Sequence, residues 1–173
     1  MIPIRPNQLA GLEWRQPSTF SREYELRSGE SLLARIVWMK TFGTLASAET
    51  AESSWTFKRT GFLTAVVTAR DTGGDTDIVT YRPNWTGAKG QLRIGGQELQ
   101  IRSANFWASR WLVLQDDAPL IEFGAKGLCK AGAELTISEA ARGRADLPLL
   151  LCFVWYILLL HMEDSAGAVI AAT

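Results

Sequence analysis

The chain has 173 residues, of which 47% are hydrophobic and 21% are charged, and this composition is typical of a folded domain rather than a disordered segment. Its 18 basic and 18 acidic side chains cancel, so the chain lacks the basic surplus with which proteins neutralise the phosphates of nucleic acids. We therefore expect a single domain over residues 1–173 that has no nucleic acid among its partners.

The cysteine and histidine content restricts the chemistry that is open to the chain. Cys129 and Cys152 lie in different segments without CxxC spacing, and with His161 as the single histidine they are too few for a zinc site. We expect no metal and no cofactor, and we interpret both thiols as small buried side chains in a reducing compartment. The first residues do not resemble a signal peptide, so we expect a cytoplasmic protein, either free or peripheral to a membrane.

Residues from about 10 to 138 alternate between apolar and polar side chains, and turn residues interrupt this alternation at short intervals. In FSREYELR, for example, Phe20, Tyr24 and Leu26 fall on one face. The clearest hairpin is QLRIGGQELQIR, in which Gly95 and Gly96 supply the positive φ values of a primed turn. The whole pattern predicts a mainly β fold in which about twelve antiparallel strands close into a barrel.

The period changes after Asp146. Residues 147–160 are apolar on every face, which is typical of a helix surrounded either by protein or by lipid. These 14 residues would span about 21 Å, less than the ~30 Å hydrocarbon core of a bilayer, and a longer helix would carry Glu163 and Asp164 into the lipid. We therefore predict a buried central helix over about residues 147–161, followed by a short strand or packed extension.

About twelve antiparallel strands followed by an apolar C-terminal helix resemble the tubby C-terminal-like superfamily, which includes the phospholipid scramblases. The resemblance is one of pattern and order, carried by the strand series from Leu12 to Ile137 and by LPLLLCFVWYILLL at residues 147–160. It implies a barrel that encloses the helix. It also implies a non-enzymatic binding or scaffold domain that engages phospholipid headgroups or a protein partner.

Enzyme motifs are missing from the sequence. There is no G-x-S-x-G, no G-x-G-x-x-G and no P-loop, and we interpret His161 as a helix-end residue that complements the helix dipole. We therefore expect no catalytic residues. Two alternatives stay open: a tail-anchored membrane protein with a cytosolic β-domain, and a small-ligand carrier or enzyme that uses a cavity at a barrel end.

Two groups of residues are candidates for binding. Four basic residues bracket the last predicted strand and lead into the helix, namely Lys126, Lys130, Arg142 and Arg144. If that strand and the start of the helix share one barrel end, the four form an anion or lipid-headgroup site; otherwise they are solvated loop charges. The second candidate is an aromatic surface in NFWASRW, where Trp107 lies near Arg110, whereas the other tryptophans are expected to fill the barrel.

Overall fold

Alternate side chains of the strands point into the barrel, as the period-two pattern predicts. In β12 (Gly132–Ile137), for example, Leu135 and Ile137 are buried whereas Glu134 and Thr136 are exposed. The computed structural model contains twelve strands within the residues that it describes, which are 1–40, 43–61, 65–105, 108–126 and 130–171.

The wall of the barrel follows the order of the sequence. Its strands are β1 (Leu12–Arg15), β2 (Glu23–Ser28), β3 (Ser31–Trp38), β4 (Ala46–Thr50), β5 (Ser54–Thr60), β6 (Val66–Asp71), β7 (Val79–Pro83), β8 (Lys89–Ile94), β9 (Gln97–Ser103), β10 (Arg110–Gln115), β11 (Ala118–Lys126) and β12. The helical elements are the short 3-10 turn η1 (Pro6–Gln8), α1 (Glu139–Arg142) and the long α2 (Leu147–Ala171).

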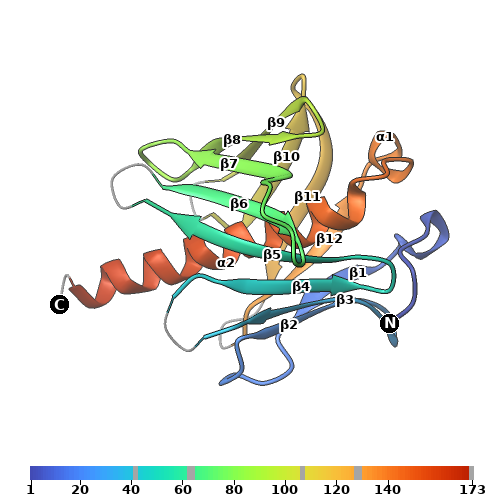
Figure 1. Ribbon diagram of the computed structural model, residues 1–173, viewed down its shortest axis with the longest axis horizontal. Coiled ribbons are helices and arrows are strands. Elements are labelled where there is room, and N and C mark those ends of the chain that lie inside the picture. The colour runs from blue at the N-terminus through green and yellow to red at the C-terminus, as the bar shows by residue number, and fades with distance from the viewer. Residues whose placement is uncertain (41–42, 62–64, 106–107, 127–129, 172–173) are drawn as a thin grey trace.

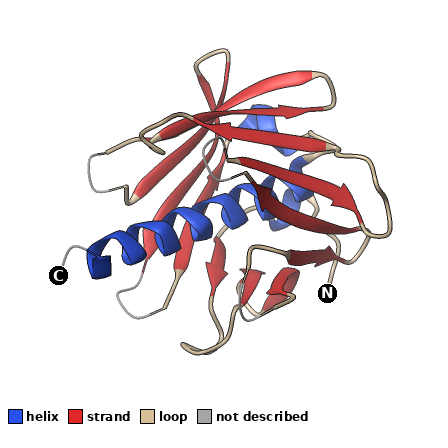
Figure 2. Ribbon diagram, turned by 60° about the vertical axis from the view of Figure 1, so that its left-hand side comes forward, coloured by secondary structure: helices blue, strands red, loops and turns tan. Residues whose placement is uncertain are grey.

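Each strand pairs in antiparallel fashion with the strands before and after it, and β1 pairs with β12 to close the barrel (Figures 1 and 2). The predicted turn between β8 and β9 is present, with φ values of +54° at Gly95 and +76° at Gly96. Such values suit a two-residue primed turn, which fixes the register of the two strands that it joins. The predicted fold class, a closed antiparallel barrel with a buried apolar helix, is confirmed.

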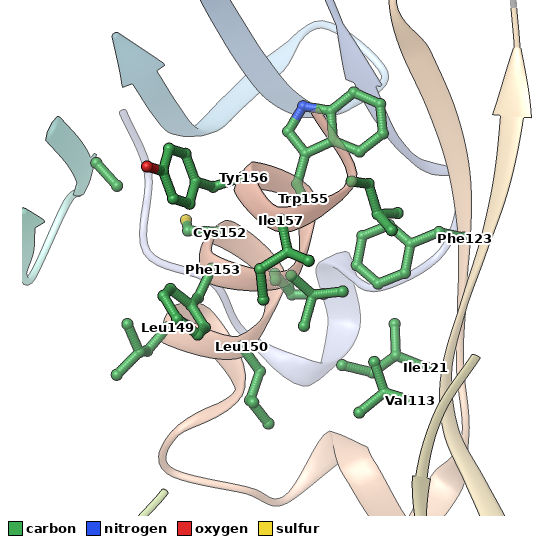
Figure 3. Packing of buried hydrophobic residues seen from close by; sticks show 14 of the residues in the cluster. Val113, Ile121, Phe123, Leu149, Leu150, Cys152, Phe153, Trp155, Tyr156 and Ile157 are labelled. Atoms are coloured by element: carbon green, nitrogen blue, oxygen red, sulfur yellow. The ribbon is translucent and has the colours of Figure 1, made fainter. Parts of the chain in front are cut away.

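Helix α2 runs along the barrel axis, and residues 149–160 are buried on all of its faces. Trp155 stacks on Trp14 of β1, with ring centroids 5.9 Å apart, while Phe153 meets Phe57 of β5 edge-on at 5.3 Å. Figure 3 shows these helix side chains reaching toward the surrounding strands in several directions. The barrel wall thus supplies the apolar surroundings that an all-round apolar helix requires.

The described part of α2 is also long and apolar enough to cross a membrane, from Leu147 to Ala168, yet 72% of its most apolar window is buried inside the barrel. The enclosure by twelve strands accounts for this apolarity without lipid. A tail anchor would have to withdraw the same residues from the core.

The end of the helix differs from the prediction. Instead of stopping near residue 161 before a short strand, α2 continues to Ala171, and the side chains from Glu163 to Ala168 are exposed. Two ion pairs with the barrel rim, Glu163 with Arg22 and Asp164 with Arg59, hold the continuing turns. The interpretation of His161 as a helix-end residue is therefore wrong, because the helix continues for ten residues beyond it.

The antiparallel order gives the barrel two different ends. Helix α2 leaves the barrel at what we call the helix-exit end, where the strands are joined by residues 16–22, 39–45, 61–65, 84–88, 104–109 and 127–131. At the opposite end the joining segments are residues 29–30, 51–53, 72–78, 95–96, 116–117 and 138–146. Figure 1 shows the helix-exit end on the left, with the C-terminus, and α1 with the N-terminus on the right.

Replacing Trp155 with aspartate tests the central position of the helix. The buried charge would have no partner, so we expect the free energy of unfolding to fall by about 4 kcal/mol or more. Ala166→Asp is the matched control, because Ala166 is exposed on the same helix and its replacement should lower stability by no more than about 1 kcal/mol, through helix propensity. Urea denaturation followed by circular dichroism measures both; a stable Trp155→Asp variant would contradict the enclosed helix.

Candidate functional site at the helix-exit end

The segments that join the strands have opposite charges at the two ends of the barrel. At the opposite end, the charged residues of the five strand–strand connections are all acids, namely Glu30, Glu52, Asp75, Asp77, Asp116 and Asp117. At the helix-exit end, the charged residues of the six connections are all bases, namely Arg22, Lys40 and Lys130. Residues 138–146, which lead into α2, carry two residues of each sign. Although the chain has no net charge, the strand connections are therefore acidic at one end of the barrel axis and basic at the other.

Three further basic residues form a cluster on the outer surface of the barrel near the helix-exit end. Lys89 at the start of β8 lies directly opposite Arg102 of β9, and Arg82 of β7 lies diagonally across from Lys89, because Arg82 pairs with Gln91. All three side chains are exposed, and no ion pair joins them to an acid in the described part of the chain. We call Arg82, Lys89 and Arg102 the basic cluster.

The pairing of Lys89 with Arg102 is unfavourable for the fold. Side chains that face each other across antiparallel strands have Cβ atoms about 4.5–5.5 Å apart, and like charges at this spacing are destabilising. Arg93, four residues further along β8 from this end, instead faces Glu98 and forms an ion pair with it at 3.8 Å. The same hairpin therefore has a complementary pair at one end and a repulsive pair at the other. A bound anion would relieve the repulsive pair.

Large apolar side chains are exposed at the same end of the barrel, and one of them, Trp85, lies beside the basic cluster. Trp85, in the turn between β7 and β8, is 96% exposed, Phe20 before β2 is 98% exposed, and Met39 after β3 is 56% exposed. Phe20 was predicted to share the buried face of Tyr24 and Leu26, but it precedes the strand and projects into solvent. Met1 and Ile2, the other exposed large apolar residues in the described part of the chain, lie at the N-terminus.

The turn that carries Trp85 is held in place by Asn84. The Asn84 side-chain oxygen accepts a hydrogen bond from the Lys89 backbone N–H at 3.2 Å, and the Asn84 N–H donates to the Lys89 carbonyl at 2.8 Å. The Asn84 side-chain amide N–H also donates a hydrogen bond to the Thr86 hydroxyl oxygen at 2.8 Å. The exposed indole therefore sits on a fixed turn, between the strand positions of Arg82 and Lys89.

Helix α2 contributes its only two acids at this end, and both are paired. Glu163 accepts from Arg22 at 2.6 Å, and Asp164 accepts from Arg59 at 2.6 Å. These pairs neutralise the acids and fix the angle at which the helix leaves the barrel. No charged residue follows Asp164 in the sequence, and the helix from Leu160 to Ala171 rises about 16 Å. The helix-exit end therefore combines a protruding helix tip without charged side chains at residues 165–171, exposed apolar turns and the basic cluster.

A cavity of about 390 Å³ opens at the same end, between α2 and the strands β5, β6, β7 and β10. Tyr81, Trp111 and His161 line it, and the His161 ring packs edge-on against Trp111 with centroids 4.9 Å apart. Burial raises the pKa of Tyr81 to about 12. Burial also lowers the pKa of His161, against a smaller opposing effect of the Asp164 carboxylate, so the imidazole is neutral at pH 7.

The four basic residues predicted to form one site are not brought together. Lys126 and Lys130 lie at the helix-exit end, where Lys126 pairs with Glu134 and the Lys130 ammonium donates to the Pro17 carbonyl at 3.1 Å. Arg142 and Arg144 lie at the opposite end, beyond β12, where they pair with Glu139 at 3.3 Å and Asp146 at 2.7 Å. The six residues of β12 separate the two pairs by about 20 Å, so the shared barrel end that the prediction required does not exist.

The predicted aromatic surface is described only in part. Trp107 lies outside the described residues. Arg110 is engaged with Glu122, whose carboxylate accepts from its Nε at 2.8 Å and its Nη2 at 2.6 Å. Trp14, Trp38, Trp55, Trp111 and Trp155 are buried as predicted, so Trp85 is the exception among the described tryptophans.

Sequence reasoning missed the basic cluster and Trp85, although a signal for part of it was present. Counting outward from the Gly95-Gly96 turn pairs position 94 with 97 and therefore Lys89 with Arg102. Like charges at paired positions on an outward face are the pattern that would have revealed the cluster. Nothing comparable in the sequence indicated that Trp85 is exposed.

No protein-family model, curated protein or solved structure matches this chain. The resemblance to the tubby-like superfamily therefore stays a prediction, while the barrel with its central helix is established by the structure.

Reversing one charge of the basic cluster should stabilise the fold. Lys89→Glu replaces a repulsive cross-strand pair with an attractive one, so we expect the free energy of unfolding to rise by roughly 0.2–1 kcal/mol. Arg93→Glu, on the same strand and outer face, should lower it by a similar amount because it opposes Glu98. Urea denaturation at low salt compares the two variants; a loss of stability in Lys89→Glu would show that the cluster is not repulsive.

Proposed function

We propose that this chain is a non-enzymatic module that docks through its helix-exit end on an anionic phospholipid surface. The observation that carries the proposal is the basic cluster, an unpaired and mutually repulsive group of bases beside the exposed Trp85. A group that weakens the fold and lacks acidic partners in the described part of the chain is well suited to an external anion.

Electrostatic attraction is the first contribution to such docking. A basic residue near an anionic leaflet contributes about 1 kcal/mol, so the basic cluster would provide about 3 kcal/mol. Lys40 and Lys130 belong to connections at the same end and add to this charge. The acids at the opposite end would be repelled by the same surface. The charge distribution therefore favours the orientation in which the helix-exit end faces the membrane, even though the chain has no net charge.

Insertion of apolar side chains is the second contribution. Tryptophan is enriched at the interface between lipid and water, where its ring lies at the level of the headgroups. Trp85 and Phe20 are almost fully exposed, and they come from different connections at the same barrel end. Stable but reversible membrane binding usually needs two signals, and charge together with apolar insertion supplies them.

The protruding end of α2 fits the same arrangement. Because Glu163 and Asp164 are neutralised by Arg22 and Arg59, residues 165–171 of the helix can approach a headgroup layer without an unpaired charged side chain. A tail anchor would instead require residues 147–160, which the barrel encloses. Peripheral docking at the cytoplasmic leaflet, where anionic lipids concentrate, therefore agrees better with the fold than a membrane-spanning helix does.

Co-sedimentation with vesicles tests the proposal. We expect the chain to bind phosphatidylcholine vesicles that contain phosphatidylserine, to bind pure phosphatidylcholine weakly, and to dissociate as salt is raised. Lys89→Glu should reduce the partition coefficient about 30-fold, since reversing a charge counts about twice its removal. Arg93→Glu makes the same charge change on the same strand at the opposite end and should leave binding unchanged.

The two charge reversals have crossed effects, which separates docking from folding. Lys89→Glu should be more stable yet bind less, whereas Arg93→Glu should be less stable yet bind normally. Trp85→Ser should also weaken binding, with Ile2→Ser at the N-terminus as its control. Membrane docking would be refuted if the unmodified chain does not bind vesicles, or if Lys89→Glu and Arg93→Glu lose vesicle binding equally. The helix-exit end would then be expected to bind a protein partner instead.

A further inference from the structure

The cavity at the helix-exit end has the size and lining of a small-molecule site. Its volume of about 390 Å³ lies within the ~300–1,000 Å³ range that is usual for such sites. One face of α2 forms a wall through Ile157, Leu160 and His161 and continues to Ala168 at the mouth. Val67 on β6 adds to the apolar lining from the sheet side. An apolar body of modest size would therefore be enclosed by both helix and sheet.

Tyr81 places a hydroxyl group in the wall of the cavity. The residue is only 3% exposed, and its hydroxyl makes no hydrogen bond within the described part of the chain. Tyr81 lines the cavity, and a phenolic hydroxyl can donate one hydrogen bond and accept another. The wall thus presents a hydroxyl with which a ligand could form a hydrogen bond.

Gly90 is what allows the Tyr81 ring to lie where it does. A Cβ atom at position 90 would be 2.6 Å from Cε2 and Cζ of the ring and 2.5 Å from the Arg82 carbonyl oxygen. The ring therefore lies against bare backbone on the neighbouring strand β8. Any other residue at position 90 would displace Tyr81, so the position of its hydroxyl depends on this glycine.

His161 supplies a second polar group to the same space. It is half-buried, and neither ring nitrogen is hydrogen-bonded within the described part of the chain. The backbone of Gly87 approaches it closely, since an added Cβ there would sit 3.5 Å from Nδ1. A neutral imidazole has one nitrogen that donates a hydrogen bond and one that accepts a hydrogen bond. In this respect it resembles a hydroxyl group, which can also donate and accept hydrogen bonds. The indole N–H of Trp111 is already used, donating to the Ala108 carbonyl at 2.9 Å, so its ring acts as apolar wall.

The charges at the mouth do not favour a charged ligand. Arg59 and Asp164 both line the cavity, but they pair with each other at 2.6 Å and cancel. The polar groups that remain inside are neutral and both donate and accept hydrogen bonds. We propose that the cavity binds a small uncharged amphiphile with an apolar, ring-sized body and a single hydroxyl head, which hydrogen-bonds to Tyr81 and His161.

Calorimetric titration with 2-naphthol, in solution and without vesicles, tests this site. We expect the unmodified chain to bind 2-naphthol and to bind 2-methylnaphthalene, in which a methyl group replaces the hydroxyl, more weakly. Tyr81→Phe should weaken 2-naphthol binding about fivefold, the equivalent of about 1 kcal/mol, and leave 2-methylnaphthalene binding unchanged. Because the hydroxyl forms no hydrogen bond with the described residues, Tyr81→Phe should not lower the unfolding temperature.

A pair of variants on the exposed part of α2 serves as the control for location. Ala168→Trp places a large side chain at the mouth and should abolish binding, whereas Ala166→Trp, on the same exposed turn but outside the cavity lining, should not change it. Equal affinities in these two variants, or no measurable binding of 2-naphthol by the unmodified chain, would overturn the proposal. Lys89→Glu should bind 2-naphthol normally, so failure of the cavity site and failure of membrane docking are distinguishable.

Discussion

The structure depends on the removal of one helix from water on every side at once. A helix with a single apolar face can be covered by one sheet, but residues 149–160 of α2 have no polar face to leave in solvent. Only a wall that surrounds them completely satisfies this condition, and twelve strands form such a wall when β1 pairs with β12. Closure also leaves no unpaired sheet edge, so the same arrangement removes a common route to aggregation.

Filling the barrel with a helix restricts binding to its ends. The interior has no room for a large ligand, since aromatic rings such as those of Trp14 and Trp155 occupy it in stacked contact. The indole N–H groups of both residues are buried without a hydrogen-bond partner among the described residues, which indicates that ring shape rather than polar contact determines this packing. Surface features therefore carry the candidate functions, and the direction of α2 makes the two ends chemically different.

The sequence predicted those parts of the molecule that local periodicity determines. Alternation predicted the strands, the all-round apolar run at residues 147–160 predicted the central helix, and Gly95-Gly96 predicted a primed turn. The rest depends on pairing across the closed barrel. Lys126 and Arg144 are near in sequence yet lie at opposite ends, because an antiparallel strand between them reverses the chain. The helix tip was missed because Arg22 and Arg59, which hold Glu163 and Asp164, are more than 100 residues away.

The position of α2 after all twelve strands has a consequence for synthesis of the chain. While a ribosome is still translating the helix, the strands that have already emerged could pair with one another, but the helix that fills the barrel is missing. A hollow wall would expose the apolar inner faces of every strand. Stable folding must therefore wait until residues 147–160 have left the exit tunnel, and chaperones can bind the exposed strands during that interval.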